Sequence, residues 1–308
     1  MSLPEYPPDN YAKVPYQHIR VKHVPEDSPT PTAVVILELH RPNNHNAFTG
    51  LMTTEIVNAL SLISHDPRIK AVVFTGHGRL FCAGADLDIG FHKESGHARD
   101  HRDGGGSVAL AIYNCTKPVI GAINGSAVGV GITMTLPMTI RIVSSSAKIG
   151  FVFARRGLVM EACSNFFLPR LIGYSKAMYI TATGAVYPST SPLLSSLFSE
   201  ILAPELVLPR ALELAQEIAQ NCSTVSVALN KDLMWRGPES PEAAQLVTSR
   251  VINELFESAD NTEGVKSFLE KRPARFTASM PQDAPQSWPW WSMIDAVPRE
   301  GPLRKSKL

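Results

Sequence analysis

Short apolar runs alternate with amphipathic stretches along the first half of this 308-residue chain. Four runs, over residues 33–39, 71–75, 119–123 and 139–143, are rich in β-branched side chains, which predicts buried strands. Between the first two, apolar residues recur at helical spacing from Met52 to Ile63, so we expect an amphipathic helix over residues 49–65. Strands that alternate with helices are typical of α/β folds with mainly parallel sheets.

The pattern becomes helical after about Leu158. Residues 165–172, 203–222, 225–235, 241–257 and 262–271 are expected to form helices. Residues 1–17 are polar and rich in proline, which predicts a loose arm, and residues 92–107 are polar and rich in glycine, which predicts a surface loop. We divide the chain into an N-terminal arm (1–29), an α/β core (30–202), a helical C-terminal region (203–276) and a tail (277–308).

Composition narrows the class of protein. Hydrophobic residues make up 44% and charged residues 19%, which is ordinary for a globular protein, and the formal net charge of +1 argues against a nucleic-acid binder. We expect no membrane span, because no apolar run is long enough, and no signal-peptide core. None of the four cysteines forms a CxxC pair, which favours reduced thiols in an intracellular compartment.

The last three residues, Ser306-Lys307-Leu308, match the tripeptide that the peroxisomal import receptor reads at a free C-terminus. The neighbouring Arg304 and Lys305 favour a solvated end. We therefore expect localisation in the peroxisome, with the import receptor as a partner. The competing interpretation is an accidental tripeptide in a basic tail.

Two loops of small residues carry the strongest functional signal. One spans Phe81 to Leu87 (FCAGADL), the other contains Gly129-Val130-Gly131, and each leads into an expected helix. Small residues leave backbone N–H groups uncovered, and two such groups from separate loops can stabilise negative charge on one carbonyl oxygen. The pair predicts an oxyanion hole and chemistry on an activated acyl group.

These loops belong to a longer ordered set of motifs: RPNNHNAF at residues 41–48, FCAGADL at 81–87, KPVIGAINGSAVGVG at 117–131 and FLEKR at 268–272. The set resembles the enoyl-CoA hydratase/isomerase (crotonase) family from roughly residue 30 to residue 276. The resemblance implies a crotonase-like α/β spiral of ββα and βαβ units with a C-terminal helical trimerisation region, and hence a homotrimer or hexamer. It also implies an acyl-CoA thioester substrate, with no separate cofactor because coenzyme A is part of that substrate, and no metal.

The resemblance assigns site residues position by position. The N–H groups of Ala83 and Val130 match the oxyanion donors, although the family usually has glycine at the second position. Substrate contacts fall on Ala83, Gly84, Ala85, Asp86 and Leu87, on Gly129 and Val130, and on Phe153, Lys271 and Phe276. Lys271 and Phe276 match a late segment that reaches coenzyme A, in some members from an adjacent subunit. A solvated helix end is an equally open interpretation of these two.

The two glutamates that the resemblance would lead us to expect are absent from their usual positions. Thr133 and Phe153 stand where a typical hydratase of the family has its two glutamates, and neither can carry a proton between carbon atoms at neutral pH. A lone carboxylate, Glu161, lies between apolar residues just before an expected helix, which resembles the single-glutamate peroxisomal Δ3,Δ2-enoyl-CoA isomerases. Apolar surroundings would raise the pKa of Glu161, whereas a helix N-terminus would lower it, and the sequence leaves that balance open.

One acid suits isomerisation of a 3-enoyl to a 2-enoyl thioester, with the enolate held in the oxyanion hole, and this is the main prediction. A single-glutamate enoyl-CoA hydratase is the alternative within the same class. A non-catalytic acyl-CoA-binding scaffold is the alternative from another class. The pair His97 and His101 has zinc-ligand spacing, but a solvated loop explains it better because no HExxH motif is present.

Overall fold

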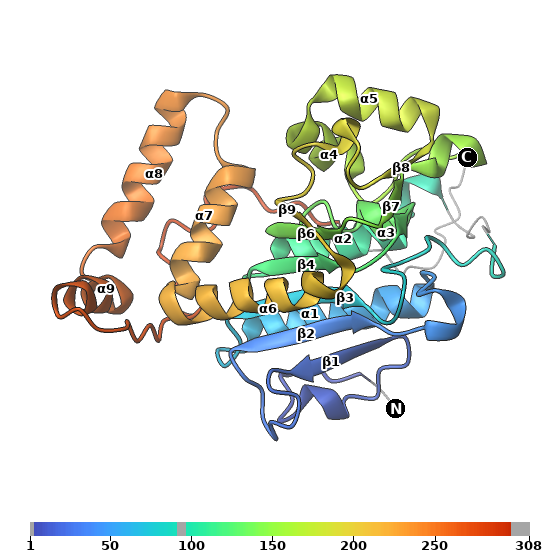
Figure 1. Cartoon of the computed structure of the whole chain (residues 1–308). Helices are drawn as coiled ribbons and strands as arrows, with labels where there is room; N and C mark the ends of the chain where they lie inside the picture. Colours follow the sequence, from blue (N-terminus) through green and yellow to red (C-terminus); the bar gives the residue numbers. More distant parts are fainter. Residues whose placement is uncertain (1–2, 91–96, 297–308) are drawn as a thin grey trace, which may run out of the picture.

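The computed structural model describes residues 3–90 and 97–296. A six-stranded sheet in the order β1-β2-β3-β4-β6-β9 forms the centre of the protein (Figure 1). Its strands are β1 (Ile19–His23), β2 (Val34–Leu39), β3 (Ala71–Gly76), β4 (Val119–Ile123), β6 (Ile140–Ser144) and β9 (Glu200–Leu202). Only the β1–β2 pair is antiparallel in this sheet, so the expected α/β fold with mainly parallel strands is confirmed.

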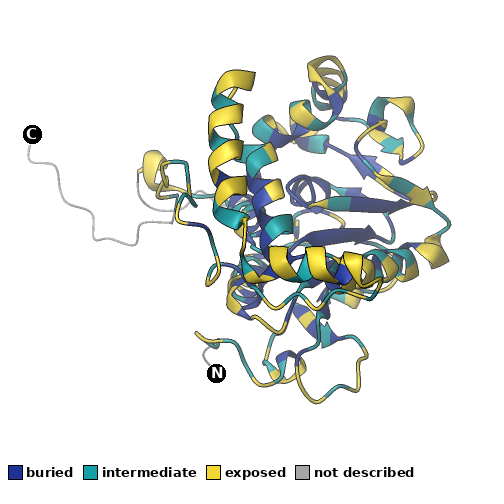
Figure 2. Ribbon diagram, turned by 90° about the vertical axis from the view of Figure 1, so that its left-hand side faces the viewer, coloured by how far each residue is buried: buried dark blue, intermediate teal, exposed yellow. Residues whose placement is uncertain are grey.

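Helices cover both faces of this sheet. Successive side chains of a strand point to opposite faces, and β2 accordingly sends Val35 and Leu37 into the layer shared with α1 (Gly50–His65) and α2 (Gly104–Asn114). Val34 points the other way, toward α6 (Pro204–Asn221). The buried stripe of α6 consists of Val207, Ala211, Ala215 and Ala219, and its small side chains allow close packing on the sheet. Figure 2 shows the strands buried between helices whose outer faces are exposed.

A smaller sheet carries the second loop of small residues. It contains β5 (Ala127–Val128), β7 (Lys148–Gly150) and β8 (Val186–Pro188), in that order. The four-residue helix α3 (Val130–Thr133) follows β5 directly. The segment after β7 forms η4 (Val152–Arg156), α4 (Ser164–Ile172) and α5 (Tyr174–Thr183), and η5 (Pro192–Leu194) precedes β9.

The N-terminal segment is more ordered than its composition predicts. Strand β1 pairs with β2 from Ile19 opposite Leu39 to His23 opposite Val35. Before it, η1 (Tyr11–Lys13) buries Tyr11, whose hydroxyl donates to Asp66 Oδ2 at 3.2 Å. The arm expected over residues 1–29 therefore contributes an edge strand and an anchored turn.

The loop expected over residues 92–107 is shorter than predicted. Residues 91–96 lie outside the described residues, Ala98–Asp100 forms η3, and α2 begins at Gly104. Three consecutive glycines disfavour a helix, but the Asp103 side chain caps this one and Val108 and Ile112 bury its inner face in the core.

The C-terminal helices agree with the sequence to within a few residues: α7 (Thr224–Arg236), α8 (Pro241–Leu255) and α9 (Ala259–Leu269). The first part of the tail packs on them, with Trp288 Nε1 donating to Asp232 Oδ2 at 2.9 Å and Trp290 Nε1 donating to the Arg236 carbonyl at 3.2 Å. Residues 297–308, which include the expected Ser306-Lys307-Leu308 signal, lie outside the described residues. Within the described ranges, no helix has the length and apolar character needed to cross a bilayer.

Candidate active site

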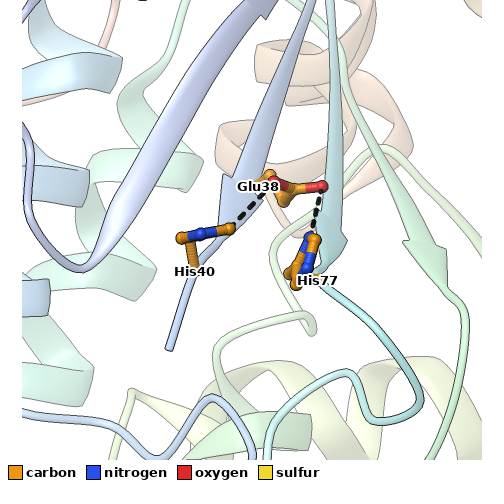
Figure 3. A group of neighbouring side chains, drawn as sticks. All are labelled: Glu38, His40 and His77. Atoms are coloured by element: carbon orange, nitrogen blue, oxygen red, sulfur yellow. Dashed lines mark hydrogen bonds and ion pairs between the residues drawn. The ribbon is translucent and has the colours of Figure 1, made fainter. Parts of the chain in front are cut away.

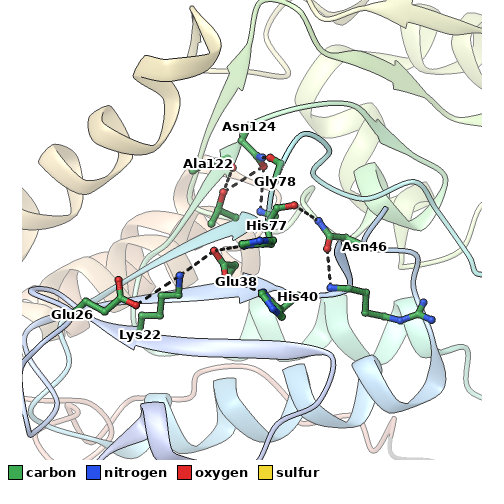
Figure 4. Close-up of polar contacts among 12 residues, drawn as sticks. Lys22, Glu26, Glu38, His40, Asn46, His77, Gly78, Ala122 and Asn124 are labelled. Carbon is green, nitrogen blue, oxygen red and sulfur yellow. Dashed lines mark hydrogen bonds and ion pairs between the residues drawn. The ribbon is translucent and has the colours of Figure 1, made fainter. Parts of the chain in front are cut away.

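The first loop of small residues starts beside a polar cluster at the carboxyl ends of β2 and β3. Glu38 Oε2 lies 3.3 Å from His40 Nδ1, and Glu38 Oε1 lies 3.4 Å from His77 Nδ1 (Figure 3). A metal could use such a group, since one ligand atom from each residue lies within 4.8 Å of the others. However, Lys22 Nζ lies 3.3 Å from Glu38 Oε1 and already balances this carboxylate (Figure 4). We therefore interpret the cluster as an anchor for the chain segments that leave both strands.

Asn46 ties these segments together. Its Nδ2 donates to the carbonyls of His77 and Leu80 at 2.9 Å and of Phe81 at 3.2 Å. Its Oδ1 accepts from the N–H of Arg41 at 2.9 Å, and Figure 4 shows Asn46 beside His77. The side chain is 1% exposed, so these bonds are shielded from water. The 41–48 motif thus holds the start of the first loop.

An ion pair fixes the other end of this loop. Arg41 Nη1 donates to Asp86 Oδ2 at 2.7 Å and to the Ala47 carbonyl at 2.6 Å. The Arg41 hydrogen bond holds the pKa of Asp86 below its ordinary value. Asp86 therefore shapes the loop, while the next side chain, Leu87, is 63% exposed.

The two loops of small residues lie against each other. Cys82 N–H donates to the Ser126 carbonyl at 3.2 Å, and Val128 N–H donates to the Cys82 carbonyl at 3.1 Å. A Cβ added to Gly131 would lie 2.4 Å from that Cys82 oxygen, so this position has no room for a side chain. Gly129 has φ of +56°, a left-handed conformation that favours glycine. The small residues thus let two backbone segments meet.

Both loops contain unpaired backbone N–H groups. In the second loop this is the expected group of Val130, but in the first loop it is not the expected group of Ala83. The N–H of Ala83 donates to the His45 carbonyl at 3.2 Å, so it is engaged. The N–H groups of Ala85 and of Val130, at the start of α3, donate to no described residue. In the first loop, the N–H groups that are free to donate therefore lie beyond Ala83, and that of Ala85 is among them.

Glu161 reaches the second loop. Its Oε1 accepts from Thr133 Oγ1 at 2.5 Å, so the threonine at a family glutamate position contacts the displaced acid. A Cβ built on Gly105 would lie 1.5 Å from Glu161 Oε2 and 3.1 Å from Val130 Cγ2, which places acid and loop on the same side of α2. The buried Oε2 has no hydrogen-bond partner in residues 3–90 and 97–296.

Burial sets the protonation of this acid. It raises the pKa of Glu161 to about 7, with a further contribution from the Asp103 carboxylate, and the hydrogen bond from Thr133 opposes the shift. Helix α4 begins three residues later, at Ser164. The pKa of Glu161 therefore lies above its ordinary value, in the direction that apolar surroundings favour. A carboxyl group with this pKa can both take and return a proton at neutral pH.

Of the remaining residues expected to contact the substrate, one lies beside the second loop and two lie far from it. The buried ring of Phe153 approaches within 4.0 Å of the point where a Cβ on Gly129 would lie, so it borders the second loop. Lys271 is exposed just after α9, and Phe276 packs against Gly264 of the same helix. Figure 1 shows α9 on the opposite side of the molecule from α3. Within one chain, Lys271 and Phe276 therefore do not join the site.

The structure adds two residues that the sequence analysis did not assign to the site. Asp103 and Gly105 lie in the glycine-rich segment whose composition predicts a surface loop. The pattern Asp-Gly-Gly-Gly did contain a signal, because aspartate is a preferred helix N-cap residue.

Comparison with known proteins decides the family. A model of the family described as enoyl-CoA hydratase/isomerase matches residues 30–279. The chain belongs to the enoyl-CoA hydratase/isomerase family. It is 50% identical over 273 residues to "Enoyl-CoA hydratase ACTT3" of Alternaria alternata, covering 88% of this chain and 90% of that protein. It is also 31% identical over 253 residues to "1,2-epoxyphenylacetyl-CoA isomerase" of Escherichia coli K12, covering 79% of this chain and 95% of that protein.

A solved enoyl-CoA hydratase from Bacillus anthracis has the same fold. It superimposes with a TM-score of 0.74 at 26% identity, covering 85% of this chain and 99% of that chain. The crotonase fold expected from the sequence is therefore confirmed, and the protein is an enzyme of this family. An acyl-CoA substrate fits the family.

Proposed function

We propose that this enzyme is an enoyl-CoA hydratase in which a single acid, Glu161, moves the proton. The observation that carries the proposal is the buried Glu161 carboxyl group beside Val130, with a pKa of about 7. The name of the 50% identical Alternaria relative supports hydration over the isomerisation that the sequence analysis put first.

One carboxyl group is enough to balance the hydration. Glu161 takes a proton from a water molecule as the water oxygen bonds to C3 of the 2-enoyl thioester. The displaced electron pair moves onto the thioester oxygen, where the N–H groups of Ala85 and Val130 stabilise it. The enolate then returns its electrons to C2, which takes the proton back from Glu161. We assign the first donor to Ala85 instead of Ala83 because the Ala83 N–H is already bonded to His45.

Isomerisation is the second candidate. The same carboxylate could take a proton from C2 of a 3-enoyl thioester and return it at C4, with the enolate in the same oxyanion hole. A single carboxyl group that can take and return a proton favours this possibility.

The binding and assembly assignments remain proposals as well. The loop from Ala83 to Leu87 would hold the adenine and pantetheine parts of coenzyme A, with Gly129 and Phe153 beside the acyl group. Lys271 and Phe276 would reach coenzyme A only from a neighbouring subunit of a trimer or hexamer. Import through Ser306-Lys307-Leu308 would place the enzyme in the peroxisome.

The test compares the wild-type enzyme with Glu161→Gln on 2-enoyl-CoA and 3-enoyl-CoA supplied separately. We expect the wild type to hydrate the 2-enoyl substrate, and the variant to lose about 100-fold or more in rate. Glu217→Gln, which changes an exposed acid on α6, is the matched control and should keep full activity. Conversion of 3-enoyl-CoA without hydration would favour the isomerase instead. Acyl-CoA binding without turnover of either substrate would contradict both and support the scaffold.

A further inference from the structure

A single oxygen of Asp103 links the first turn of α2 to the segment that carries Glu161. Asp103 Oδ1 accepts from the N–H of Gly106 at 2.5 Å and from the N–H of Ala162 at 3.3 Å. The first bond caps α2, and the second holds the residue directly after Glu161. Any movement of this carboxylate therefore changes both elements.

The backbone after Glu161 requires such support. Ala162 and Cys163 have φ of +56° and +54°, a left-handed conformation that residues with a Cβ rarely adopt. The Ser164 hydroxyl donates to the Glu161 carbonyl, and the Ser164 N–H donates to the same oxygen at 3.1 Å. Strained residues persist where surrounding contacts fix them, and such residues gather at functional sites. Asp103 and Ser164 provide these contacts from the two sides of the turn.

The charge of Asp103 also acts on the Glu161 side chain. A second carboxylate beside Glu161 disfavours its ionised form and can accept a hydrogen bond from its protonated form. The other titratable groups facing Glu161 are the thiols of Cys82 and Cys163, and burial raises the pKa of both, that of Cys82 to about 12. Arg155 turns away and donates to the Thr183 carbonyl. Asp103 is thus the charged neighbour of this acid in the described ranges.

We propose that Asp103 is a positioning residue that holds Glu161 against the second loop and keeps this acid able both to accept and to return a proton. The inference rests on the proposed function, since it gives Glu161 a partner for that chemistry. In this arrangement, the Asp103 carboxylate at the start of α2 tunes the single acid that Thr133 contacts.

The decisive variant is Asp103→Asn, which keeps an oxygen for the two N–H groups but removes the charge. Without the neighbouring anion, Glu161 loses its proton at lower pH. We expect the acidic limb of kcat/KM to move down by roughly one pH unit, with KM for the thioester nearly unchanged. Asp103→Ser keeps a capping side chain if the first variant folds poorly. Asp100→Asn, a partly exposed acid three residues earlier, is the matched control and should leave the limb in place.

An infrared titration makes failure of this inference distinguishable from failure of the proposed function. The carboxyl band that is present in the wild type and absent in Glu161→Gln reports the protonation of Glu161 without any turnover. A lower midpoint in Asp103→Asn supports the role of Asp103, even if neither enoyl-CoA is converted. An unchanged midpoint and an unchanged acidic limb in a folded Asp103→Asn enzyme would overturn it.

Discussion

Substitution of Gly105 by alanine is a sharp test of where Glu161 lies, because it adds only one carbon atom. A Cβ at Gly105 would stand 1.5 Å from Glu161 Oε2, and contacts below 3.0 Å essentially never occur. In Gly105→Ala, the carboxylate must therefore retreat by about 1.5 Å. A misplacement of about 1 Å can cost about 100-fold in rate, so we expect at least that loss in kcat/KM.

We expect Gly105→Ala to lose much more activity than thermal stability. Alanine is favoured over glycine in a helix by up to about 1 kcal/mol, which offsets part of the strain in α2. The assay is therefore steady-state hydration of 2-enoyl-CoA together with thermal unfolding of the same samples. Gly50→Ala, at the start of α1, is the control, since nothing lies within 4 Å of its added Cβ. Full activity of Gly105→Ala would refute the placement of Glu161 against α2.

Three further predictions concern the acid and its surroundings. Thr133→Val removes a hydrogen bond that lowers the pKa of Glu161, so the acidic limb of kcat/KM should move to higher pH; a shift to lower pH would contradict this. Because the folded-state pKa of Glu161 is raised from 4.5 to about 7, stability present below pH 4.5 is lost as pH rises to 7. Denaturant titrations should show the wild type losing about 3 kcal/mol relative to Glu161→Gln across that window, and parallel curves would contradict it. Gly131→Ala should lower both the midpoint of thermal unfolding and kcat/KM, because its Cβ would meet the Cys82 carbonyl oxygen at 2.4 Å; an unaffected enzyme would show that the loops are further apart.

The large sheet and its helices could be predicted because their signals are local. The runs that became β2, β3, β4 and β6 are short and β-branched, and α1 has an unbroken helical period. Strand β1 has a local signal too, since Ile-Arg-Val-Lys-His alternates apolar and basic side chains, but it is short, it follows a proline-rich arm, and its pairing with β2 is what the sequence does not show. Helix α2 was missed because its three glycines carry no helical signal, and packing of its inner face stabilises it.

The site could be predicted in part, because its motifs are also local signals in the sequence. Motif spacing identified both loops and Glu161, but it could not show which N–H groups remain free. The hydrogen bond from Ala83 to His45 depends on how two distant segments pack. The contact of Asp103 with Ala162 joins residues 59 positions apart, and no local pattern encodes it.

The pH dependence of kcat/KM for hydration of 2-enoyl-CoA by the wild-type enzyme tests the central claim most directly. If Glu161 is the base, with a pKa of about 7, the rate should fall on the acidic side with an inflection near pH 7. The residual activity of Glu161→Gln should lack that inflection. An inflection near 4.5, the ordinary value for a glutamate, or a rate that stays flat across neutral pH, would contradict the account.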